Sequence, residues 1–538
     1  MNRSTVETVL QPTLPLVAAI ALIAAGPAPK YDIVEKSIPE LQADLAAGRT
    51  TSAALVRLYG ARIAALNPKL HAVIVLNPAA PAAAAAADAA RRAGRPGGPL
   101  AGIPILLKDN IESLDPIATT AGSLALAKNI GGRDAPLVAR LRAAGAIILG
   151  KTNLSEWANI RSSHSISGWS AVGGQARNPY AFDRNTCGSS AGSGAAAAAS
   201  FAAATIGTET DGSVTCPAAI NGLVGLKPTV GLVSRTFIVP ISHSQDTAGP
   251  MTRSVRDAAL VLDAMAGSDP ADPATKAANS MGHDFAAALK PGALKGVRVG
   301  VLRFAADFHP ETEVVFKKSL AVLQAAGATL VDIAKFPGDA KLGELEQAVL
   351  MTELKADLNG YLASTNPERV RTRSLADLIA FDKAHAAQEM PLFGQELFET
   401  AEKTKGLADP AYLKAVADAH RLAGPEGIDK LLADNKVSVL VAPTLGPSWL
   451  IDPVLKDNFA GGGAGQAPAV AGYPHLTVPM GLVDGLPVGL SFIGAAWSDR
   501  TLLAYGYAFE QAAQARRPPR YLPTVEIKSL AAANAGIR

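Results

Sequence analysis

Residues 187–213 read CGSSAGSGAAAAASFAAATIGTETDGS. Two clusters of small and polar residues flank an alanine-rich helix and a short strand in this stretch. A helix of about 12 residues and a strand of about 5 residues each span roughly 17 Å, so the chain returns to the level at which it started. We therefore expect Ser189 and Ser213 to lie side by side, one near a helix N-terminus and the other in a turn that contains glycine.

The turn before Ser213 is suited to binding a negatively charged oxygen. Its successive backbone N–H groups can converge on one point, and an oxyanion hole requires such a nest of donors. After the turn, Pro217 is expected to start a short helix that Gly222 ends. The turn would then be held between two rigid elements, as a catalytic turn must be.

A serine nucleophile also needs a base, and none of the 8 histidines has a neighbouring sequence typical of that role. Lys108 follows the apolar run 102–107 and precedes Asp109 and Asn110, so it stands at the end of what should be a buried strand. Burial lowers the pKa of a lysine from its usual value of about 10.4, and the neutral amine can then act as a base. Taken alone, the same position would instead favour an exposed lysine that opens a loop.

Short β-rich runs alternate with helical stretches along the chain. This alternation predicts an α/β fold whose sheet is covered by helices on both faces. A nearly all-alanine run at residues 79–92 is expected to be a helix, and about residues 338–435 are expected to form a helical lobe of the same domain. The expected strands are residues 72–76, 103–107, 146–149, 297–302, 329–333, 437–441 and 488–492.

Composition excludes several classes of protein. The chain has 538 residues, of which 49% are hydrophobic and 18% charged, so it can bury a large core. Its net charge of +3 supplies no basic stripe for nucleic acid. Its 2 cysteines, Cys187 and Cys216, allow at most one internal disulfide and no Cys-rich metal site, and the H-E-x-x-H motif of zinc proteases does not occur. We expect no metal.

The first 28 residues are typical of a signal peptide. Residues 14–25 form an apolar run that is too short to cross a bilayer, Arg3 precedes it and small residues follow it. We therefore expect a periplasmic or secreted protein, with a cytoplasmic one as the alternative. No later run is long and apolar enough for stable membrane insertion. Residues 29–538 are then expected to form a single domain.

Two well-known motifs occur here in the wrong context. Residues 145–152 fit the G-x-x-x-x-G-K-T pattern of nucleotide-binding loops, but the residues between the two glycines are themselves strand-like. Residues 188–192 fit G-x-S-x-G with Ser190 as a nucleophile. That motif needs a buried strand directly before it, whereas residues 178–186 (NPYAFDRNT) are polar and rich in turn formers. We expect neither motif to function.

Six ordered blocks of the sequence together resemble the amidase signature family. They are residues 102–110 (GIPILLKDN), 150–156 (GKTNLSE), 188–193 (GSSAGS), 207–213 (GTETDGS), 225–229 (GLKPT) and 246–250 (DTAGP). The resemblance is specific because the blocks agree in order over about residues 100–255, the signature core. It implies a large mixed β-sheet between helical layers.

The resemblance also implies a catalytic triad that works without a cofactor. Ser213 would be the nucleophile, Ser189 a proton relay in a cis peptide, and Lys108 the base. The oxyanion hole would be made by the backbone N–H groups of Thr210, Asp211, Gly212 and Ser213. Two departures stand out: Cys187 and Ala191 replace glycines of the serine block, and Asp211 replaces the first glycine of the usual G-G-S.

Within the family, other stretches most resemble the peptide amidases, which remove the C-terminal amide of peptides. These stretches are residues 155–159, 165–170, 374–381, 392–396 and 421–427. Trp157, Trp169 and Tyr473 either line a groove for the peptide or belong to the core. The partner would be a small-molecule or short-peptide amide. The alternatives are a generalist amidase of small aliphatic or aryl amides, a glutaminase-type subunit, and a binding protein without turnover; the oligomeric state stays open.

Overall fold

The computed structural model describes residues 31–95, 97–337 and 339–526. The expected signal peptide, residues 1–28, lies outside these ranges. Within them, no helix combines the length and the apolar character needed to cross a membrane.

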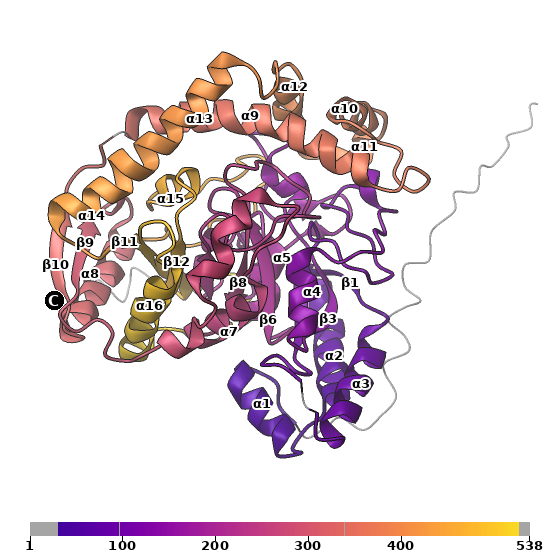
Figure 1. Cartoon of the computed structure of the whole chain (residues 1–538), viewed down its shortest axis with the longest axis horizontal. Helices are drawn as coiled ribbons and strands as arrows, with labels where there is room; N and C mark the ends of the chain where they lie inside the picture. Colours follow the sequence, from indigo (N-terminus) through magenta and orange to yellow (C-terminus); the bar gives the residue numbers. More distant parts are fainter. Residues whose placement is uncertain (1–30, 96, 338, 527–538) are drawn as a thin grey trace, which may run out of the picture.

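A mixed sheet runs through the described part of the chain and has eleven strands (Figure 1). Parallel pairs join β2 to β3 and β6, and β9 to β10 and β11, whereas the pairs between β6 and β11 are antiparallel. In spatial order the strands are β1 (Val73–Leu76), β3 (Ile147–Thr152), β2 (Pro104–Lys108), β6 (Ala204–Glu209), β8 (Thr247–Thr252), β7 (Val224–Lys227), β12 (His475–Val483), β13 (Leu486–Ile493), β11 (Val439–Pro443), β9 (Arg298–Leu302) and β10 (Thr329–Ile333).

Helices cover this sheet in two layers, which confirms the expected fold class. In one layer α5 and α6 pack on each other and on the central strands, and in the other α7, α8 and α16 do so. The helices are α1 (Ile38–Ala46), α2 (Ser52–Leu70), α3 (Ala80–Arg92), α4 (Pro136–Ala143), α5 (Ala191–Ala198), α6 (Thr215–Ile220), α7 (Val255–Met265), α8 (Pro310–Ala325), α9 (Asp339–Ser364), α10 (Leu375–Ala384), α11 (Ala386–Glu389), α12 (Glu396–Glu402), α13 (Pro410–Ala423), α14 (Lys430–Asn435), α15 (Gln466–Val470) and α16 (Asp499–Ala513).

Helix α5 is buried along its whole length, and its composition explains how. It consists only of Ala, Gly and Ser, so its backbone can approach the sheet closely. A Cβ atom on Gly192 would lie 2.5 Å from the backbone nitrogen of Asn153. No residue larger than glycine fits at that crossing.

The helices between residues 339 and 435 arch over one side of the sheet, as the chain colours in Figure 1 show. α9 and α13 pack along each other and form the main part of this arch. Leu354 and Leu358 of α9 belong to one apolar cluster with Phe398 of α12, and this cluster also includes Trp157 and Val239 from outside the segment. The mostly helical character expected for this part of the chain is confirmed.

The expected strands are all present, with shifts of one to two residues at most of their ends. Three further strands of the sheet, β7, β8 and β12, were not expected. β8 reads TAGPMT, and a glycine and a proline in a short run are typical of loops rather than strands. Tertiary burial outweighs that local preference, because all six of its residues are buried in the middle of the sheet.

Two local expectations need correction. The alanine-rich helix is eight residues long rather than about twelve, because the chain already turns at Ser200, whose φ is +54°. The short helix after Ser213 starts at Thr215, two residues before Pro217. It can start early because the Glu209 carboxylate accepts the N–H groups of Val214 and Thr215.

Candidate active site

Lys108 is the last residue of β2, and its side chain is completely buried. Its Nζ atom donates to Ser189 Oγ at 2.8 Å, to Thr208 Oγ1 at 2.7 Å and to the Thr208 carbonyl at 3.2 Å. The neighbouring strand β6 supplies Thr208, and the segment before α5 supplies Ser189. The amine is therefore held in one direction, toward the serine.

Burial lowers the pKa of Lys108 to about 7. The negative charges of Asp246 and Glu209 act in the opposite direction, but the cost of desolvating an ammonium group is larger. A substantial share of Lys108 is then neutral at pH 7. The expectation of a buried lysine with a lowered pKa is confirmed, and the alternative of an exposed lysine is wrong.

Ser189 and Ser213 lie in segments that a backbone hydrogen bond joins, as expected. The backbone N–H of Ser190 donates to the carbonyl of Ser213 at 3.1 Å, which ties the start of α5 to the turn after β6. The peptide bond between Gly188 and Ser189 is cis. Ser189 is fully buried, whereas Ser213 is 8% exposed. Ser213 Oγ makes no hydrogen bond to another described residue.

The turn 210–213 presents free donors. Among the described residues, the backbone N–H groups of all four expected donors, Thr210, Asp211, Gly212 and Ser213, find no acceptor. Gly212 adopts a φ of +74°, the left-handed conformation that brings consecutive N–H groups to the same side. The carbonyl of Gly212 accepts the N–H of Cys216 at 2.8 Å, so the turn is anchored to α6.

Two consecutive residues, Gln245 and Asp246, bind Thr210, and the sequence alone assigns a role to neither. Its hydroxyl donates to Asp246 Oδ1 at 2.6 Å, and its carbonyl accepts from Gln245 Nε2 at 3.3 Å. Asp246 is itself held by the backbone N–H groups of Ile241 and Ser242. Asp246 belongs to one of the six sequence blocks that resemble the family, but no sequence pattern marks Gln245.

A cavity of about 470 Å³ lies beside this turn. Its lining includes Thr208, Thr210 and Asp246, which lie near the catalytic turn, and Asp357 and Tyr361 of α9. Its lining does not include Lys108, Ser189 or Ser213, so the cavity adjoins the serines rather than containing them. The lining also includes an apolar run, residues 237–241, together with the charged side chains of Arg235 and Asp272.

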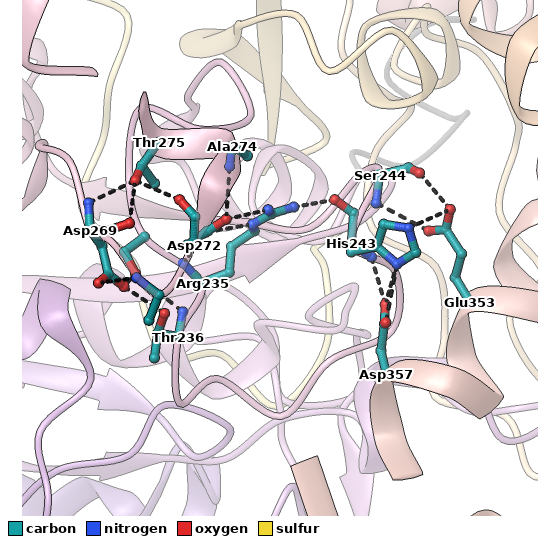
Figure 2. A network of polar contacts seen from close by, with 12 residues as sticks. Arg235, Thr236, His243, Ser244, Asp269, Asp272, Ala274, Thr275, Glu353 and Asp357 are labelled. Carbon is teal, nitrogen blue, oxygen red and sulfur yellow. Dashed lines mark hydrogen bonds and ion pairs between the residues drawn. The ribbon is translucent and has the colours of Figure 1, made fainter. Parts of the chain in front are cut away.

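Residues that could in principle bind a metal meet at the rim of this cavity. Figure 2 shows His243 between Glu353 and Asp357 of α9. Glu353 already accepts the hydroxyls of Ser242, Ser244 and Tyr412, and Asp357 accepts both the backbone N–H and the Nδ1 atom of His243. The carboxylates of Glu353 and Asp357 thus bind the loop 242–244 to α9. Because their oxygens already accept these hydrogen bonds, the three residues fit a structural role better than a metal site.

The aromatic residues named from the sequence belong to the core. Trp157 is 3% exposed and packs edge-on against Phe398 at 5.9 Å, and Trp169 is 8% exposed and packs edge-on against Phe393 at 5.2 Å. Tyr473 is buried and donates its hydroxyl to Asp429. Of the two alternatives for these side chains, the structure supports the core.

The two misleading motifs are structural. Strand β3 occupies Ile147–Thr152, so no phosphate-binding loop exists there, and the buried amine of Lys151 bonds to Thr119 Oγ1 at 2.7 Å. Ser190 is fully buried; its hydroxyl donates to the Thr208 carbonyl at 3.0 Å and accepts the Thr208 N–H at 3.2 Å. No strand precedes Ser190 directly.

The two cysteines form a disulfide, with a Cα–Cα distance of 6.1 Å. It links the residue before the cis peptide to α6, which follows Ser213. The bridge closes around both serines, since Ser189 and Ser213 lie between Cys187 and Cys216 in the chain. It is a covalent support for the site and takes no part in its hydrogen bonds to Lys108.

Known proteins are similar to this chain along most of its length. The Amidase family model matches residues 54–503. The X-ray structure of native peptide amidase from Stenotrophomonas maltophilia is 54% identical, covers 91% of this chain and 99% of its own, and superposes with a TM-score of 0.87. A structure of the peptide amidase PAM with the competitive inhibitor chymostatin is also 54% identical, covers 91% and 100%, and has a TM-score of 0.88.

A probable amidase of Arabidopsis thaliana is 40% identical over 499 residues, which are 91% of this chain and 93% of the relative. The family match spans more than four fifths of the chain, and the similar sequence and the similar structures each cover 91% of it. The protein belongs to the amidase signature family and is an amidase, a hydrolase of amide bonds.

Proposed function

We propose that this amidase releases ammonia from the C-terminal amide of peptides through Ser213, Ser189 and Lys108. The observation that carries the proposal is the contact of a buried, partly neutral lysine amine with Ser189, next to a turn whose N–H groups are free. A base, a relay, a nucleophile and an oxyanion hole are the parts that acyl transfer needs.

In the proposed reaction, Ser213 Oγ attacks the amide carbon while its proton passes to Ser189 and the proton of Ser189 passes to Lys108. The N–H groups of Thr210, Asp211, Gly212 and Ser213 stabilise the negative oxygen of the tetrahedral intermediate. Lys108 then returns a proton through Ser189 to the leaving nitrogen, so that ammonia departs and an ester on Ser213 remains. Water attacks the ester by the same route, which releases the peptide acid and restores the serine.

The substrate class is supported by the relatives and by the cavity. Both peptide amidase structures cover nearly the same length as this chain at 54% identity. The cavity offers an apolar wall, residues 237–241, beside the catalytic turn, where the side chains of a short peptide can be buried. An acyl pocket that orients the last residue leaves room only for a small NH₂ leaving group, so an internal peptide bond would clash.

The test compares kcat/KM for a dipeptide amide, the same dipeptide extended by one residue, benzamide and free glutamine, with ammonia release as the readout. We expect efficient hydrolysis of the dipeptide amide and no cleavage of the extended peptide. Ser213→Ala serves as the blank for ammonia from other sources. A preference for benzamide would favour the generalist amidase, a preference for glutamine the glutaminase type, and cleavage of the extended peptide would remove the exo-amidase assignment.

We also propose that the first 28 residues direct export, so that the enzyme meets peptides outside the cytoplasm. The support is the apolar run 14–25, which follows Arg3. The full chain is expressed in a Gram-negative host, and the N-terminus of the amidase in the periplasmic fraction is sequenced. Export predicts a shortened N-terminus there, whereas an intact chain confined to the cytoplasm would contradict it.

A further inference from the structure

Gln245 lies in the loop before β8, outside the residues assigned to the triad and the oxyanion hole, and is 1% exposed. Its amide nitrogen has two acceptors: the carbonyl of Thr210 at 3.3 Å and Glu346 Oε1 at 2.8 Å. An amide nitrogen has two hydrogens, so both are used. We propose that Gln245 is a positioning residue that orients the oxyanion hole by fixing the peptide group between Thr210 and Asp211.

The argument rests on the planarity of the peptide bond. In a trans peptide group the carbonyl and the following N–H point in opposite directions. A hydrogen bond that holds the Thr210 carbonyl on the side of Gln245 therefore directs the Asp211 N–H to the other side. That N–H is one of the free donors of the turn, next to those of Gly212 and Ser213.

The next residue, Asp246, also binds Thr210. It accepts the Thr210 hydroxyl at 2.6 Å, so one loop holds both the main chain and the side chain of the same residue. Because Gly212 adopts a positive φ and lies two residues on, the turn has a flexible position on its far side. Without Gln245, the peptide group between Thr210 and Asp211 can rotate about its flanking bonds.

Helix α9 holds Gln245 through the carboxylate of Glu346. Glu346 of α9 is 6% exposed, and its second oxygen accepts Gln466 Nε2 at 2.8 Å. Gln245 and Gln466 thus donate to the same carboxylate at the same distance, but only Gln245 reaches Thr210. Gln466 is therefore a matched control for Gln245. Substitution of either glutamine removes one donor from Glu346, but only substitution of Gln245 also removes the donor to the Thr210 carbonyl.

The loop that carries Gln245 is also clasped to α9 by Glu353, which accepts the hydroxyls of Ser242 and Ser244. Figure 2 shows the Ser244 side of this clasp. Helix α9 thereby connects the helical segment 339–435 with the donors of the oxyanion hole.

The proposal rests on the proposed mechanism, and its test compares Gln245→Met with Gln466→Met on any primary amide that the wild type hydrolyses. The measurements are kcat, KM, the Ki of a peptide aldehyde, whose adduct with the serine carries an oxyanion, and the Ki of the peptide acid, which does not. Removal of one oxyanion donor costs about 10²- to 10³-fold in kcat. For a donor that is misaligned rather than lost, we expect a fall of about 10- to 100-fold.

In Gln245→Met we expect kcat to fall and the aldehyde Ki to rise by similar factors, while KM and the Ki of the peptide acid change less than about twofold. In Gln466→Met we expect all four to stay within about twofold. Gln245→Ala, which removes the same donors without burying a longer apolar chain, should reproduce the split if Gln245→Met does not fold. An unchanged kcat in folded Gln245 variants, or equal losses in the Gln466 control, would overturn the assignment. If the wild type hydrolyses other primary amides but not peptide amides, the proposed substrate class is wrong, and the role of Gln245 is tested on those other amides.

Discussion

The Nζ atom of Lys108 lies 2.8 Å from the Oγ atom of Ser189, although the two residues are 81 positions apart in the chain. Strands β2 and β6 are parallel neighbours, and the segment before α5 passes over their ends. Both side chains are fully buried. The same burial lowers the pKa of Lys108, so the amine that contacts Ser189 is partly neutral at pH 7.

Replacing Ser213 by alanine should abolish turnover, by about 10⁴-fold or more, because no acyl-enzyme can form. Ser190→Ala should keep most of the activity, since the Ser190 hydroxyl is committed to the Thr208 backbone. Loss of those two bonds should lower the free energy of unfolding by about 1–3 kcal/mol. Initial rates and urea unfolding of both variants test this. An active Ser213→Ala with a dead Ser190→Ala would reverse the assignment.

The rate should depend on pH through Lys108. With a pKa of about 7, the amine is protonated below that pH, so kcat/KM should fall about tenfold per pH unit on the acid side. Lys108→Ala should cost several orders of magnitude. Lys108→Arg should not rescue it, since a guanidinium stays charged. An arginine variant with the pH profile and rate of the wild type would contradict the role of a neutral base.

Substitution of Glu209 should shift the acid limb of the pH profile, the pH range in which kcat/KM falls as Lys108 is protonated. Its negative charge raises the pKa of Lys108 against the larger effect of burial. Glu209→Gln therefore should lower the pKa of Lys108 further and move the limb to lower pH.

The control for this substitution is Asp257→Asn, a buried carboxylate that does not act on Lys108 and should leave the limb in place. The pH profile of kcat/KM is measured for both variants. A limb that stays in place or moves upward in Glu209→Gln would show that the titrating group is not Lys108.

The disulfide should be dispensable for catalysis but not for stability. Cys187 and Cys216 are separated by 29 positions, and closing a loop of that size lowers the entropy of the unfolded chain by an amount worth about 3–4 kcal/mol. The Cys187→Ser, Cys216→Ser double variant should therefore unfold at lower denaturant concentration, with kcat within a few-fold of wild type. Loss of activity in a double variant that is folded by circular dichroism would show that the bridge is part of the catalytic machinery.

The sequence by itself determined those features that depend on local composition. The small residues of 191–198 specify a helix that can lie close to a sheet, and the apolar run before Lys108 specifies a buried strand with a lysine at its end. From these, the proximity of Ser189 and Ser213, a nest of N–H donors in the turn before Ser213, and Lys108 as a candidate base could be predicted before any coordinates. The resemblance of the ordered blocks added the family and the triad roles that it implies.

Only the tertiary structure decided the contacts between distant segments. β8 contains glycine and proline and is a strand because neighbours on both sides pair with it, and the cysteines bridge because the fold brings their Cα atoms within 6.1 Å. Gln245 is 35 positions from Thr210, and nothing in its own neighbourhood marks it. Its contact depends on where β6, the loop before β8 and α9 meet, because hydrogen bonds between remote segments are set by packing and not by local pattern.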